Sequence, residues 1–190
     1  MKKVIAISLL AVGSAALLTG CAEAPGTYDV EASLSCYVAA MGGIEFGEPL
    51  LTDTEYTLEE DGSQTLTLYF TKSSVTIYSI TCYTFIDPSP ASGEDPEEGQ
   101  PANGTIGYYA GDTVVTEGVS YTLSEDTAPN NLQEEVHYVD SITFPITEKT
   151  DTYSLTLYIN SNVMGVQFTN DKYKATLTVD WDSLTAKEGA

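Results

Sequence analysis

Apolar and polar residues alternate along much of the chain. The clearest stretch is residues 65–71, in which Leu66 and Leu68 share one face and threonines occupy the other. Residues 153–160 and 174–181 alternate in the same way, and all three stretches are rich in Thr, Tyr, Leu or Val. A period of two with this composition is typical of strands that are buried on one side. The pattern therefore predicts three half-buried β-strands.

Further stretches have the same character, and none of the chain after the first twenty residues has helical periodicity. The other strand candidates are residues 29–40, 54–59, 74–87, 105–109, 118–123, 136–147 and 163–169. About 8–10 short strands in one domain predict an all-β sandwich or barrel of antiparallel sheets. We expect the last four strands, from residue 136 to residue 182, to follow one another as a meander.

The first twenty residues have the features of a signal peptide. Lys2 and Lys3 precede an apolar run over residues 4–18, which is too short to span a bilayer comfortably. The run ends in Leu-Thr-Gly before Cys21, which resembles the lipobox of bacterial lipoproteins. That resemblance implies that Cys21 becomes the N-terminus and carries acyl chains such as palmitate, and two such chains hold a soluble domain on a membrane. The alternative is an ordinary secretory signal with a chance cysteine.

These features divide the chain into five parts. Residues 1–20 are the expected signal peptide, residues 21–27 a tether, residues 28–184 one β-domain and residues 185–190 a tail. Within the domain, residues 87–104 are acidic and rich in Pro and Gly, so they predict a mobile loop. The expected location is extracytoplasmic, with the protein anchored to the bacterial cell membrane by its lipid.

The charge of the chain excludes several partners. Seven lysines and no arginine stand against 28 Asp and Glu residues. Removal of Lys2 and Lys3 leaves five lysines against those 28 carboxylates, a formal charge of −23. Such a surface repels phosphate backbones and anionic lipid headgroups. We therefore expect no nucleic-acid partner, and contact with the membrane only through the anchor.

Two cysteines remain after the anchor. Cys36 and Cys82 both lie in alternating, strand-like sequence. An exported location permits a disulfide between them. Two separate buried thiols are equally compatible with the sequence.

Catalytic residues are scarce. His137 is the only histidine, which excludes the usual zinc hydrolase and blue-copper ligand sets. No Gly-x-Ser-x-Gly elbow is present, and the carboxylates gather in predicted turns. We therefore expect a protein that is not an enzyme.

The two methionines of the mature chain have similar surroundings. Met41 and Met164 are each followed by glycine and a short apolar stretch. Glycine lets a backbone approach a flat ligand closely, and a thioether is a soft ligand for haem iron or copper(I). The alternative is that both side chains fill gaps in the core.

The segments around these methionines resemble the streptococcal cell-surface haem-binding protein Shp family. The matching stretches are residues 41–71 and 157–179. The resemblance implies an immunoglobulin-like (NEAT-like) β-sandwich that holds one haem (heme b) between Met41 and Met164. It also implies a role in haem relay, with surface haem donors or acceptors and an uptake transporter as partners.

On this hypothesis, apolar residues beside the methionines would line the haem cleft. They are Ile44, Phe46, Val163, Val166 and Phe168. Lys172 and Lys174 are the cationic residues nearest in sequence for the haem propionates. The alternative function is a cofactor-free adhesion or recognition module, in which some of the 13 tyrosines bind glycan or protein.

Overall fold

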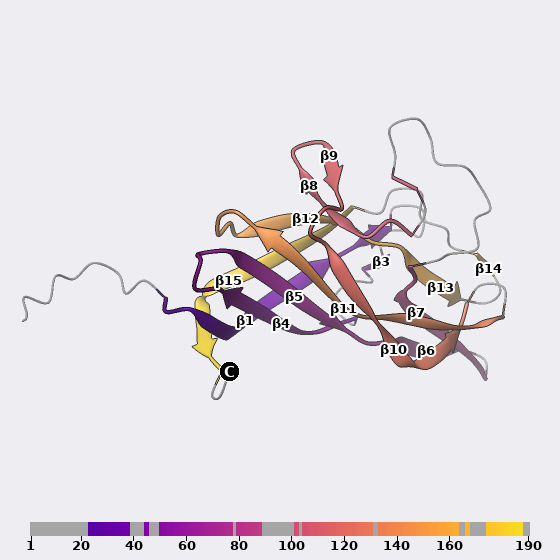
Figure 1. Cartoon of the computed structure of the whole chain (residues 1–190). Coiled ribbons are helices and arrows are strands. Elements are labelled where there is room, and N and C mark those ends of the chain that lie inside the picture. Colours follow the sequence, from indigo (N-terminus) through magenta and orange to yellow (C-terminus); the bar gives the residue numbers. More distant parts are fainter. Residues whose placement is uncertain are drawn as a thin grey trace, which may run out of the picture.

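The computed structural model describes residues 23–38, 44–45, 50–77, 79–88, 101–102, 104–130, 133–163, 166–167 and 174–187. These residues form antiparallel β-sheets, which confirms the predicted all-β fold (Figure 1). No helix in this part of the chain is long and apolar enough to cross a membrane.

Nine strands form the main sheet. In spatial order they are β10 (Ser120–Pro129), β11 (Glu135–Ile146), β5 (Gln64–Phe70), β4 (Leu51–Leu58), β1 (Gly26–Ser35), β15 (Lys174–Ala186), β12 (Thr152–Thr156), β8 (Gly107–Ala110) and β9 (Thr113–Val115). The alternation expected for β15 is confirmed, since Ala175, Leu177 and Val179 are buried while the residues between them are exposed. The edge strand β10 is irregular, because its pairing with β11 shifts on both sides of Leu123.

Two smaller sheets accompany the main sheet. The four-stranded one has the order β14 (Val166–Gln167), β13 (Ile159–Val163), β7 (Ile80–Ile86) and β6 (Ser73–Ile77). The two-stranded one pairs β2 (Tyr37–Val38) with β3 (Ile44–Glu45). Phe85 of β7 lies 6.0 Å from Tyr138 of β11 between ring centroids, so the four-stranded sheet packs on the main sheet as in a β-sandwich.

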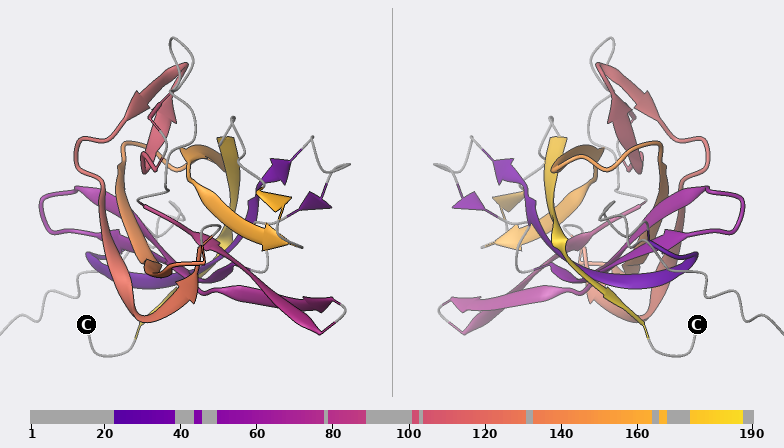
Figure 2. Two further views of the ribbon diagram at one scale, coloured as in Figure 1. Left: turned by 90° about the vertical axis from the view of Figure 1, so that its right-hand side faces the viewer. Right: turned by 90° about the vertical axis from the view of Figure 1, so that its left-hand side faces the viewer.

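The main sheet curls around the core (Figure 2). β8 and β11 are separated by five strands in the spatial order, yet the rings of Tyr108 and Phe144 have centroids 5.9 Å apart. Phe144 also lies 6.0 Å from Tyr153 of β12 between centroids. The inward faces therefore enclose one main hydrophobic cluster, and its largest fully buried members include Tyr56, Phe144, Leu66 and Leu155.

Three expectations from the sequence are wrong. Residues 153–160, expected as one half-buried strand, are divided between β12 and β13, and every residue from Leu155 to Asn160 is buried. The stretch 74–87 is two strands, β6 and β7, joined at a turn in which Ser79 has a φ of 67°. The last strands do not form a meander: β11 pairs with β5 and β10, β12 pairs with β15 and β8, and β13 joins the four-stranded sheet. Alternation shows which side of a strand is buried, but it carries no information about which strand lies beside it.

The strands extend slightly beyond the expected domain limits of 28 and 184. β1 begins at Gly26, and β15 continues to Ala186. The expected mobile loop at 87–104 lies mostly outside the described residues. The immunoglobulin-like topology implied by the family resemblance stays a prediction.

Candidate functional site

The two methionines themselves, Met41 and Met164, lie outside the described residues. The strands on either side of them are described. Val38 pairs with Ile44, so residues 39–43 connect the antiparallel strands β2 and β3. Val163 pairs with Val166, so Met164 and Gly165 connect β13 and β14. Each methionine therefore belongs to the connection between two short antiparallel strands.

The main sheet brings β1 and β12, the strands of this sheet that precede the two connections, close together. Ser35, at the end of β1, pairs with Thr176 of β15. Thr156, at the end of β12, pairs with Lys174 of the same strand. β1 and β12 therefore lie on either side of β15 and run parallel to each other. They end opposite Thr176 and Lys174, which are two residues apart on β15. Neighbouring strands are about 4.8 Å apart, so the two strand ends are separated by roughly 10 Å.

The other residues expected in a haem cleft are only partly described. The backbones of Ile44, Val163 and Val166 belong to β3, β13 and β14. Phe46, Phe168 and Lys172 lie outside the described residues. Lys174 is exposed, and its ammonium lies 4.8 Å from the centre of the Tyr109 ring.

A buried polar pair fixes the start of β13 beside the end of β7. The Asn160 amide nitrogen donates a hydrogen bond of 2.9 Å to a carboxylate oxygen of Asp87. The Asp87 backbone N–H donates to the Tyr158 carbonyl, also over 2.9 Å. Asp87 and Asn160 are each 2% exposed. Sequence reasoning missed this pair, because Asp87 opens a Pro-rich stretch and has the appearance of a loop residue.

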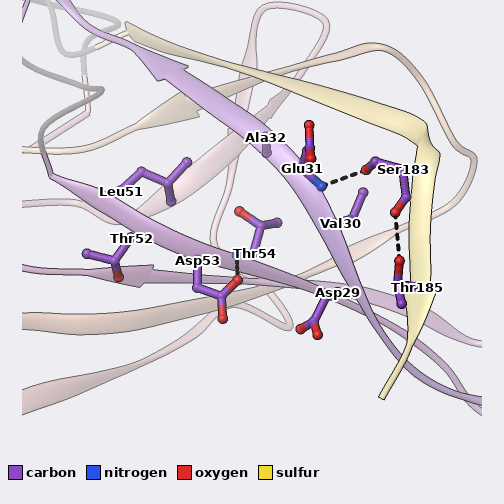
Figure 3. A pocket seen from close by; sticks show the side chains of 10 residues that line it. All are labelled: Asp29, Val30, Glu31, Ala32, Leu51, Thr52, Asp53, Thr54, Ser183 and Thr185. Carbon is purple, nitrogen blue, oxygen red and sulfur yellow. Dashed lines mark hydrogen bonds between the residues drawn. The ribbon is translucent and has the colours of Figure 1, made fainter. Parts of the chain in front are cut away.

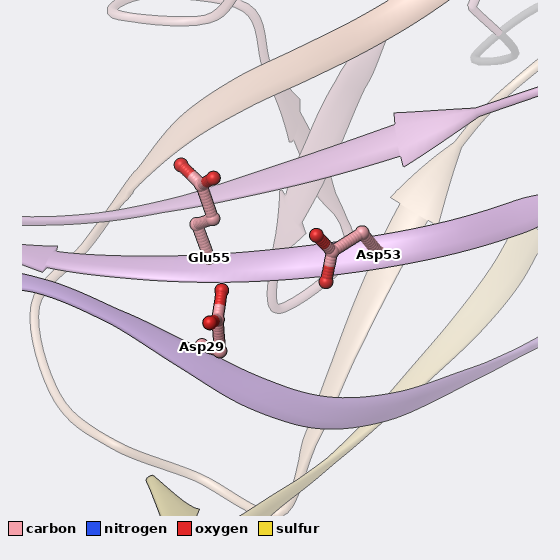
Figure 4. A group of neighbouring side chains, drawn as sticks. All are labelled: Asp29, Asp53 and Glu55. Atoms are coloured by element: carbon pink, nitrogen blue, oxygen red, sulfur yellow. The ribbon is translucent and has the colours of Figure 1, made fainter. Parts of the chain in front are cut away.

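Three carboxylates meet on the outer side of β1 and β4 (Figure 4). Oxygens of Asp29, Asp53 and Glu55 all lie within 4.8 Å of one another. The Lys187 ammonium bonds to Glu55 and lies 3.0 Å from Asp29 Oδ1, and these two carboxylates raise the pKa of Lys187 above its usual range. The Tyr69 hydroxyl donates to Glu55 over 3.0 Å; burial first, and this bond second, raise the pKa of Tyr69. The Lys187 ammonium is therefore the cation that balances part of the negative charge of these three carboxylates.

A cavity of about 470 Å³ opens beside these carboxylates, between β1 and β4 (Figure 3). The two strands pair only as far as Asp29 and Glu55, and beyond that point β1 continues along β15 alone. The lining residues are Asp29, Val30, Glu31, Ala32, Leu51, Thr52, Asp53, Thr54, Ser183 and Thr185. Polar atoms dominate this lining, so the cavity is unsuited to a porphyrin, which needs apolar walls.

A second cavity, of about 380 Å³, is lined by tyrosines. Tyr108 and Tyr109 of β8 form one side, and Tyr153 of β12 and the loop before it form the other. Tyr153 is held in place, because its hydroxyl donates to the Glu148 carbonyl over 2.9 Å and accepts the Thr150 N–H over 3.0 Å. We call this cavity the tyrosine groove.

Cys36 and Cys82 are both buried, and the structure does not join them to each other. Cys36 packs in the main hydrophobic cluster, whereas Cys82 lies on β7 of the four-stranded sheet. Of the two alternatives left by the sequence, the structure has two separate side chains.

His137 lies on β11 with an exposed side chain. Its ring Nδ1 is 2.9 Å from the Ser124 carbonyl oxygen of the neighbouring strand β10. The geometry is that of a strand residue that contacts its neighbour, as the sequence predicts.

No family model, curated protein or solved structure matches this chain.

Proposed function

We propose that this protein is a cell-surface lipoprotein that binds one haem between Met41 and Met164 and relays it for uptake. The observation that carries the proposal is the common end point of β1 and β12 on either side of β15. From there β1 leads into the connection that contains Met41, and β12 leads through β13 into the one that contains Met164. The described strand ends that precede these two residues, which are 123 positions apart in sequence, therefore lie about 10 Å apart on β15.

The ligand chemistry suits transfer of haem. Two thioethers are neutral, weakly basic donors that favour ferrous iron and release it readily. The porphyrin would be held mainly by burial of its apolar faces. The chain has no arginine, so the propionates would face solvent, with Lys174 at the start of β15 as the described lysine nearest to Met164 in sequence.

Titration with haemin tests the proposal. A soluble form that starts at Ala22 is expected to show a saturable Soret shift at one haem per chain. Met41→Ala and Met164→Ala should each remain folded and give the spectrum of five-coordinate or water-ligated iron, and the double variant should lose tight binding. His137→Ala is the matched control, because it removes the only imidazole; its spectrum should equal that of the wild type. A double methionine variant that binds haemin as well as the wild type would contradict the proposal.

A second candidate function is recognition of a glycan by the tyrosine groove. Three tyrosines line this groove together with polar residues that include Glu148, Thr150 and Thr152. Aromatic faces stack on sugar rings while polar atoms bond to sugar hydroxyls. A glycan array probed with the wild type and with Tyr109→Ala tests this function. Binding that is lost in the variant, together with no Soret shift for the wild type, would favour this candidate over haem binding.

A further inference from the structure

The segment before β1 is held against one end of the curled sheet. Glu23 Oε1 lies 2.8 Å from the Lys149 ammonium. That ammonium in turn lies 4.4 Å from the centre of the Tyr56 ring and 4.8 Å from that of Trp181. Cation–π contacts of this kind add to the ion pair. Glu23 therefore lies over the end of the sheet at which Lys149 covers the aromatic residues.

Two further contacts fix the direction of this segment. The Tyr28 hydroxyl donates a hydrogen bond of 2.6 Å to the Ala24 carbonyl. From Gly26 onwards the backbone pairs with β4, from Leu58 to Glu55. An exposed ion pair alone contributes little stability, but here the backbone pairing with β4 holds the segment and the ion pair only directs the residues before β1.

The expected lipid anchor is very close to this end. Only Ala22 separates Cys21 from Glu23. Since each residue spans at most about 3.6 Å, the Cα atom of Cys21 lies within roughly 7 Å of that of Glu23. Acyl chains on Cys21 would enter the bilayer, so the end of the sheet with Lys149 and Trp181 must face the membrane surface.

The ends of β1 and β12 that lead to the methionines lie at the opposite end of the main sheet. β1 has ten residues, which corresponds to a length of about 30 Å. Tyr28, near the anchor, pairs with Ala186, whereas Ser35 pairs with Thr176 near the start of β15. Figure 1 shows β3, β13 and β14 on the side of the molecule away from the C-terminus.

We infer that the anchored domain stands upright, with the Lys149–Trp181 end against the membrane and the ends of β1 and β12 at Ser35 and Thr156 facing outward. The functional consequence rests on the proposed haem binding: haem would be exchanged about 30 Å from the membrane surface, with a protein that reaches this outer end. The orientation itself depends only on the anchor and on the fixed segment before β1.

Energy transfer from tryptophan to the membrane measures this orientation, because Trp181 is the only tryptophan. The lipidated, haem-free protein is bound to vesicles of phosphatidylcholine and phosphatidylglycerol that contain a dansyl-labelled lipid. Transfer from Trp181 should be several-fold higher than transfer in W181F/T176W, which moves the single tryptophan to an exposed position near the start of β15. A flexible Gly/Ser linker of about 20 residues inserted between Ala22 and Glu23 should lower the transfer from Trp181 without changing the fold.

Equal transfer from the two positions, higher transfer from position 176, or no effect of the linker would overturn the inference. So would a protein that fails to float with the vesicles. All of these measurements are made without haem, so they are independent of the haemin titration. If the titration fails and the transfer result stands, the orientation remains and only the haem proposal is lost.

Discussion

Asn160 and Asp87 form a hydrogen bond of 2.9 Å in which both side chains are 2% exposed. This bond connects the start of β13 to the residue that follows β7. Asn160 lies four residues before Met164 in the sequence. We expect Asn160→Ala to lower the free energy of unfolding by about 1–3 kcal/mol, because it leaves the buried Asp87 carboxylate with one donor fewer. Urea denaturation measures this. The matched control is Thr178→Ala on the exposed face of β15, which should change stability by less than about 0.5 kcal/mol. Equal effects of the two substitutions would show that the Asn160 bond contributes no net stability.

We expect stability to fall at alkaline pH through Lys187 and Tyr69. Hydrogen bonds to Glu55 and Asp29 raise the pKa of Lys187 above its ordinary 10.5, and burial with the Glu55 bond raises the pKa of Tyr69 above its ordinary 10.0. Both groups bind their proton more tightly in the folded chain. The stability that these two protonated groups add to the folded state is therefore fully present below about pH 10 and is lost as the pH rises above it.

Urea denaturation between neutral pH and pH 11 checks this dependence. Lys187→Met should be less stable than the wild type at neutral pH and should lose less stability above pH 10. Lys174→Met, which removes an exposed lysine from β15, should keep the wild-type profile. A parallel decline in the wild type and Lys187→Met would contradict the role of Lys187.

We expect Cys36 and Cys82 to be thiols in the folded protein. The structure places them in different parts of the interior and does not join them. A soluble form that starts at Ala22, unfolded without reductant and treated with iodoacetamide, should gain two carbamidomethyl groups by intact mass. A mass with no added groups until reductant is present would instead establish the disulfide.

We expect Cys21 to carry the membrane anchor. The motivation is the apolar run that ends in Leu-Thr-Gly before this cysteine. Cys21→Ser should release the protein into the medium or leave the precursor uncut, as judged by cell fractionation and mass. Normal processing and membrane retention of the variant would exclude lipidation at Cys21.

The strands were predictable from the sequence where one face is buried along their length. Leu66 and Leu68 of β5, and Leu177 of β15, are each at most 1% exposed, as their alternation indicates. The turn between β6 and β7 was not predictable, because Ser79 takes a positive φ without a neighbouring Gly, Asn or Asp to signal it.

Contacts between residues far apart in sequence could not be predicted from any local pattern of the sequence. Lys187 reaches Asp29 and Glu55 only because β1 lies between β4 and β15. Lys149 covers Trp181 for a similar reason, since the loop before β12 folds over the end of the sheet. The methionine hypothesis came from local sequence, but the convergence of β1 and β12 on β15 required the strand order.

The irregular edge strand β10 affects how copies of the proposed lipoprotein would behave when crowded on a membrane. Copies anchored as proposed would diffuse in two dimensions, where collisions between sheet edges are frequent and a regular free edge would recruit another chain. β10 carries Tyr121 and Leu123 at 47% and 48% exposure, which would favour such contacts. However, its pairing is interrupted on both sides of Leu123, and Glu125 and Asp126 follow at once. Broken register and negative charge together oppose edge-to-edge polymerisation, so a dense layer of this protein would remain one of separate molecules.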